Sequence, residues 1–283
     1  MVRISSISAW AGLLLSPAFC APFTPNAPII TRNVLAKRAE PQTGDDFPDI
    51  GPHPTSLDKV EGAFNDAIEL AAYALTQLAQ DDNTILKHYF NEGDKDKVKN
   101  VFQTLIGTSN TPENPATGNE KLGNIFVQTD DAQNACSDGR TLAYMEDHNT
   151  DKPFIVLCPR AFSKKGVTAI NGADPDKDSR YYINCTDLVA NGHVSYLMNS
   201  LGATLLHEYL VGSPIIDQPD GYGPVNVYNK LDKTLALTNA DSYMYYALEV
   251  LWTILCNEVN DFAAPRAGID DDDPDCGNQA CQP

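Results

Sequence analysis

The sequence predicts an α+β fold in which helices dominate and the sheet is small. Three observations indicate this class. A long stretch from residue 55 repeats apolar residues every three or four positions, as an amphipathic helix does. Two short apolar runs near the middle of the chain suit strands, and helical patterns return after them. The chain is long enough to bury one sizeable core, so we expect one domain, over residues 55–265.

The N-terminal residues have the pattern of a secreted protein. Residues 1–20 combine a short basic start, a short apolar run and a small-residue ending, which is typical of a signal peptide. No stretch of the sequence is apolar for long enough to span a membrane. Residues 21–38 are rich in proline and end in Lys37-Arg38, a pair cut by secretory processing proteases. We therefore expect a pro-segment here, and an extracellular protein that begins near Ala39.

The first half of the domain is predicted to be helical and then to form strands. Residues 39–54 are polar and contain several prolines, so they are expected to be a flexible lead-in. The apolar period then predicts a long helix from Thr55 or Ser56, followed by shorter helices in ILKHYF and KDKVKNVFQTLIG. The strands are expected in NIFVQTD and PFIVLCP, separated by a charged connection that holds RTLAYMED.

The second half is predicted to contain two longer helical regions. One runs from about Val194 to Leu210, and the other from about Asn226 to Val259 with a break near Asn239. Residues 266–283 form an acidic, turn-rich tail that contains two cysteines. Its aspartate run lacks the loop pattern of a calcium site, so it is expected to be solvated.

The cysteine count indicates disulfides. Loss of Cys20 with the signal peptide leaves an even number, which permits three bonds in an oxidising compartment. The disulfide candidates are Cys136, Cys158, Cys185, Cys256, Cys276 and Cys281. No pair has the Cys-x-x-Cys spacing of a zinc knuckle. Asn184 begins an Asn-Cys-Thr sequon, which predicts glycosylation.

The charge balance excludes two classes of partner. The net charge is −18, and residues 1–38 contain four basic residues and no acidic one, so the remaining chain is more acidic still. Its field repels nucleic acid and anionic membranes.

One short motif carries the candidate chemistry. Residues 205–212 read LLHEYLVG, with His207 and Glu208 late in an apolar helix. In a His-Glu-x-x-His helix the two histidines stand one turn apart and bind zinc, while the glutamate activates the water on the metal. The position of the second histidine is Val211, which cannot bind a metal. Asp241 lies near the start of a later helix, from which its carboxylate could reach His207.

The order of these segments resembles the aspzincin metalloendopeptidases, the fungal deuterolysin type and its lysine-specific relatives. The shared features are the His-Glu helix, an aspartate-containing loop with Tyr-Gly, and the segment NADSY, all within residues 180–262. The resemblance implies a zincin-like metalloprotease domain. It further implies that His207 and Asp241 are zinc ligands, and that Glu208 is the base that deprotonates the zinc-bound water.

Other family positions correspond less completely. The second histidine ligand maps onto Val211. The family's catalytic loop aspartate corresponds to Asp217 or Asp220, between which the sequence does not decide, and Tyr222 matches the tyrosine of Tyr-Gly. The candidates for a tyrosine that steadies the oxyanion are Tyr181, Tyr182 and Tyr196.

Three functions follow as expectations. The first is a secreted endopeptidase that hydrolyses a protein or peptide substrate with a zinc-activated water. Loss of one direct ligand predicts a fall in zinc affinity or activity of at least about 10- to 100-fold. The second is a non-catalytic, protease-derived binding protein or antigen that binds zinc or protein weakly. The third is a secreted, disulfide-bonded protein with no relation to metal.

Overall fold

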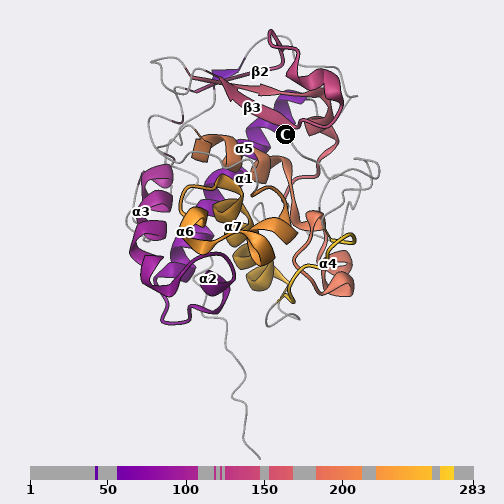
Figure 1. The fold of residues 1–283 in the computed structure, drawn as a ribbon. Helices are drawn as coiled ribbons and strands as arrows, with labels where there is room; N and C mark the ends of the chain where they lie inside the picture. Colours follow the sequence, from indigo (N-terminus) through magenta and orange to yellow (C-terminus); the bar gives the residue numbers. More distant parts are fainter. Residues whose placement is uncertain are drawn as a thin grey trace, which may run out of the picture. The chain divides into compact units, whose positions relative to one another are not determined.

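The computed structural model describes residues 42–43, 56–107, 118, 122, 125–146, 153–167, 183–211, 221–256 and 262–270 (Figure 1). These residues form mainly helices with a small sheet, so the predicted α+β class is confirmed. The predicted signal peptide, the pro-segment and most of the acidic tail lie outside the described residues. None of the described helices is both long enough and apolar enough to cross a membrane.

The long first helix, α1, spans Ser56–Leu78 and confirms the predicted apolar stripe. The stripe is buried along its length, from Val60 and Phe64 to Leu75 and Leu78. The short helix α2 (Thr84–Tyr89), the 3-10 turn η1 (Glu92–Asp94) and helix α3 (Lys95–Ile106) follow. Helix α3 ends at Gly107, whose φ of 70° is the left-handed cap expected of a glycine there.

The sheet has four strands in the order β1-β2-β4-β3. They are β1 (Gln42–Thr43), β2 (Phe126–Gln128), β3 (Ala143–Glu146) and β4 (Phe154–Leu157). Strands β1, β2 and β4 are parallel, whereas β3 pairs antiparallel with β4. The two predicted strands are β2 and β4. Strand β3 lies in the segment that we interpreted as a connection, and β1 lies in the predicted lead-in.

The helix that carries the His-Glu motif begins later than predicted. A 3-10 turn, η6 (Tyr196–Met198), comes first, and α5 spans Leu201–Val211. The reason is local: the Ser200 hydroxyl accepts a hydrogen bond from the backbone N–H of Ala203 at 3.0 Å and so caps the new helix. Helix α5 packs against α1 and lies beside β3 (Figure 1).

The last helical region is divided into three parts. A π-helical turn, η7 (Asn226–Lys230), is followed by α6 (Lys233–Ala236) and α7 (Ala240–Leu255). The expected break near Asn239 is confirmed, because this residue caps α7 by accepting a hydrogen bond from the N–H of Ser242 at 2.7 Å. Helix α7 is buried over most of its length and contacts both α1 and α5.

The remaining described elements are η3 (Ala135–Asp138), η4 (Pro159–Ser163) and the helix α4 (Cys185–Asn191), which the sequence did not predict. Two disulfides join Cys136 to Cys158 and Cys185 to Cys256, so four of the six predicted disulfide cysteines are paired. Cys276 and Cys281 lie outside the described residues.

Candidate functional site

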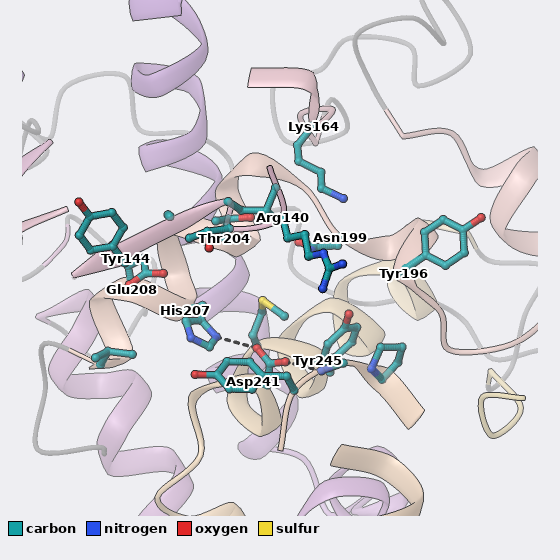
Figure 2. Close-up of a pocket in the computed structure, with 18 of the residues that line it drawn as sticks. Arg140, Tyr144, Lys164, Tyr196, Asn199, Thr204, His207, Glu208, Asp241 and Tyr245 are labelled. Atoms are coloured by element: carbon teal, nitrogen blue, oxygen red, sulfur yellow. Dashed lines mark hydrogen bonds and ion pairs between the residues drawn. The ribbon is translucent and has the colours of Figure 1, made fainter. Parts of the chain in front are cut away.

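A cavity of about 370 Å³ opens between β3, α5 and the start of α7 (Figure 2). His207 and Glu208 reach it from α5, and Asp241 reaches it from the first turn of α7. Apolar side chains make up much of the remaining wall. They include Leu142, Met145, Val211 and Met244.

His207 and Asp241 are in direct contact. The Nδ1 atom of His207 lies 2.6 Å from Oδ1 of Asp241, although 34 residues separate the two in the chain. Both side chains are mostly buried, with exposed fractions of 11% and 7%. The other carboxylate oxygen of Asp241 accepts the backbone N–H of Gly223 at 2.7 Å. Both oxygens of this carboxylate are therefore held in place.

The Gly-Tyr-Gly segment is shaped to fit against α7. The side-chain amide of Asn239 donates to the carbonyl of Gly221 at 3.3 Å. A Cβ atom on Gly221 would lie 2.2 Å from Nδ2 of Asn239, so a larger residue cannot occupy this position without moving the contact. This anchoring fixes the segment that donates to Asp241. Between the two glycines, the ring of Tyr222 stacks near His207, with centroids 5.9 Å apart.

Glu208 is buried on the same wall of the cavity, with 6% of its surface exposed. Figure 2 shows it between His207 and Tyr144. The hydroxyl of Tyr144 donates to Oδ1 of Asp131 at 2.6 Å. Burial, together with this carboxylate, raises the pKa of Tyr144, so its phenol stays protonated in neutral solution.

The described residues do not make a complete zinc site. Among them no group of three or more histidine, cysteine or acidic side chains is arranged to hold a metal. Val211 lines the cavity where the second histidine of the motif would stand. Zinc shared tetrahedrally by His207 Nδ1 and Asp241 Oδ1, with bonds of about 2.1 Å, would hold these atoms about 3.4 Å apart. At 2.6 Å they bond to each other instead. Zinc binding therefore stays a prediction.

The other sequence candidates are distributed as follows. Tyr196 lines the cavity, whereas Asp217, Asp220, Tyr181 and Tyr182 lie outside the described residues.

The glycosylation candidate Asn184 is 8% exposed and caps α4, accepting the N–H of Asp187 at 2.8 Å. Two further histidines, His193 and His88, do not line the cavity. His193 contacts the carbonyl of Ala264 at 2.8 Å, and His88 contacts Glu249 at 2.8 Å.

Sequence reasoning missed several residues of the cavity. Arg140, Tyr144 and Lys164 line it from segments that were interpreted as connections or lay outside any motif. No local pattern identifies them, because they reach the cavity only through the pairing of β3 with β4 and the turn after β4. The chain matches no known protein-family model and no curated protein sequence. The resemblance to aspzincins therefore stays a prediction from the motifs alone.

Proposed function

We propose that this chain is a secreted, metallopeptidase-like protein whose cavity binds a peptide segment and whose zinc-dependent hydrolysis is strongly weakened. One observation carries the proposal: His207, Glu208 and Asp241 line a single cavity, and Val211 lines it at the position of the motif's second histidine. A catalytic zinc normally has three protein ligands and one open position. With only two of the expected zinc ligands identified, we expect the cavity to bind a peptide but to hydrolyse it slowly.

The edge of the sheet supports a peptide as the ligand. In the order β1-β2-β4-β3, strand β3 is terminal, and among the described strands it pairs only with β4. Residues of β3 also line the cavity. An edge strand can pair with an extended peptide through backbone hydrogen bonds, while neighbouring pockets receive alternate side chains. The cavity beside β3 is such a pocket.

The lining of the cavity also suits a peptide. Its volume, about 370 Å³, lies within the range of about 300–1,000 Å³ that is usual for ligand pockets. Met145, Val211 and Met244 offer apolar contact, and His207 with Asp241 supplies a fixed polar pair. A peptide presents the same combination of apolar side chains and hydrogen-bonding groups.

A second candidate is an active metalloendopeptidase. It is favoured by the position of Glu208, next to His207 on α5 and in the same cavity as Asp241. This candidate requires a third zinc ligand from another residue. Among the described residues the set of zinc donors is incomplete.

One experiment separates the two candidates. The mature protein is mixed with labelled hexapeptide libraries, and both binding and cleavage are measured, with and without added zinc. We expect binding with little cleavage, and loss of binding in His207→Ala. The matched control is His193→Ala, because His193 contacts Ala264 outside the cavity. Cleavage that Glu208→Gln abolishes would establish the peptidase, and absence of peptide binding would refute the proposal.

A further inference from the structure

We propose that the cavity selects peptides that carry a large apolar side chain, with Met145 and Met244 as the residues that receive it. This inference rests on the proposed function, since it names the class of peptide that the cavity binds. Met145 belongs to β3 and Met244 to α7, yet both line the same cavity. The sequence contains four methionines, so half of them lie in the wall of this one cavity.

Strand β3 presents Met145 on the face that packs toward the helices. Successive side chains of a strand point to opposite faces, so Ala143 and Met145 share one face. Both residues pack against the hydrophobic core, and β3 contacts α5. Met145 is nevertheless only partly buried, and it lines the cavity. A ligand in the cavity can therefore contact its side chain.

Helix α7 presents Met244 three residues after Asp241, and residues at this spacing lie on the same helix face. Helix α5 repeats the arrangement, with Val211 four residues after His207. All four residues line the cavity, and the dashed line in Figure 2 marks the bond between His207 and Asp241. Each helix thus places an apolar side chain next to one member of the fixed polar pair.

These neighbours favour an apolar side chain on the ligand. Apolar surface that leaves water for an apolar wall is stabilised in proportion to its area. A polar side chain that is seated against the methionines loses its hydration and gains no strong hydrogen bond from them. A large apolar side chain should therefore bind more tightly here than a small or a polar one.

Methionine also predicts which apolar side chains fit. Its side chain is unbranched and has three rotatable bonds, so it adapts to ligands of different shape. Its sulfur makes favourable contacts with aromatic rings. We therefore expect the cavity to accept both leucine and phenylalanine, with phenylalanine preferred.

A peptide side chain, and not a free fatty acid, is the expected occupant. The polar pair of His207 and Asp241 adjoins the apolar residues, and a peptide offers backbone hydrogen-bonding groups directly beside an apolar side chain. A fatty acid has its polar group at one end, so its hydrocarbon chain would cover the pair without bonding to it.

The test uses positional hexapeptide libraries and the full mature protein. Each library fixes Phe, Leu, Ala or Gln at one position of a neutral peptide, because the net charge of −18 repels acidic peptides. At one position we expect the Leu library to bind at least about ten-fold more tightly than the Ala and Gln libraries. The Phe library should exceed the Leu library by about two- to ten-fold.

Variants assign these preferences to the two methionines. Met145→Leu and Met244→Leu keep the apolar surface but remove the sulfur, so each should reduce the preference for Phe over Leu while the preference for Leu over Ala persists. The effect should be larger at Met145, because Met244 is only 3% exposed. Met145→Gln should weaken binding of the Leu library by about ten-fold.

Met198→Leu is the matched control, because Met198 is fully buried and does not line the cavity. It should leave both preferences unchanged. Thermal unfolding of each variant checks that the fold is retained, and laurate is measured as a fatty-acid probe.

The outcomes are distinct. Equal binding of the four libraries at every position overturns this inference and leaves the proposed function intact. Preferences that persist unchanged in every Met145 and Met244 variant do the same. Failure of every library to bind, with or without binding of laurate, overturns the proposed function and this inference with it.

Discussion

Replacement of Gly202 by alanine tests how closely α5 approaches α1. A Cβ atom at this position would lie 2.4 Å from Cβ of Asp66 and 3.0 Å from the carbonyl of Ala63, both on α1. Carbon atoms in contact normally lie about 3.5–4.0 Å apart, so the helices must separate by more than about 1 Å. Asp66 is itself buried and accepts the N–H of Val167 at 3.0 Å, so it cannot move freely.

The expected cost follows from this overlap. Overpacking of a core destabilises a protein by about 1–3 kcal/mol, occasionally more. Alanine has a higher helix propensity than glycine, which offsets up to about 1 kcal/mol of this loss. We therefore expect Gly202→Ala to lower the free energy of unfolding by about 2 kcal/mol. For a domain of this size that corresponds to a fall in Tm of about 4–8 °C. The same displacement moves α5 relative to α7, so the contact between His207 and Asp241 should loosen.

Urea unfolding followed by circular dichroism measures this difference, and Gly62→Ala provides the control. Gly62 also lies in a helix, α1, but an added Cβ meets nothing within 4 Å. Its replacement should raise stability by about 0.5–1 kcal/mol. Equal effects of the two substitutions would refute the close approach of α1 and α5.

Three further predictions concern the disulfides, the buried tyrosines and the cap of α7. Replacing Cys185 and Cys256 by alanine should cost about 4 kcal/mol in urea unfolding, because this disulfide closes a separation of 71 residues; a negligible cost would contradict its presence. Burial raises the pKa of Tyr209 above its usual 10.0. The free energy of unfolding should therefore not depend on Tyr209 below about pH 10, and above it should fall by up to about 1.4 kcal/mol per pH unit. Tyr209→Phe should reduce this slope. An unchanged slope would contradict a raised pKa of Tyr209. Asn239→Ala removes a buried cap, so we expect a loss of about 1–3 kcal/mol that Asn239→Asp partly restores, measured by the same unfolding assay; no recovery would argue against the cap.

The helices were predictable where the relevant pattern is local. In α1 the apolar residues recur on one face, so periodicity alone identified the buried stripe. The start of α7 was predictable because Asn239 is a residue type that caps helices. The proximity of His207 and Asp241 could not be predicted from a local pattern. It was expected from the motif resemblance, since no local rule relates residues 34 positions apart.

Strand β3 and the cavity residues Arg140 and Lys164 were not predictable in the same way. All four residues of β3 are partly buried, so the strand lacks the alternation that marks one with a buried and an exposed face. Arg140 and Lys164 line one cavity because β3 pairs with β4 and η4 then turns the chain back. Charged residues in connecting segments carry no sequence signal that they line a common cavity.

Zinc titration of the wild-type protein and of Val211→His tests the central claim most directly. Val211 already lines the cavity one turn after His207, so the new imidazole would supply the missing ligand beside Asp241. Competition with a chelating dye gives the affinities, and Val211→Leu controls for a change of volume. We predict weak zinc binding by the wild type and by Val211→Leu, and an affinity at least about 10- to 100-fold higher in Val211→His. One tightly held zinc in the wild type, or no gain in Val211→His, would contradict this account.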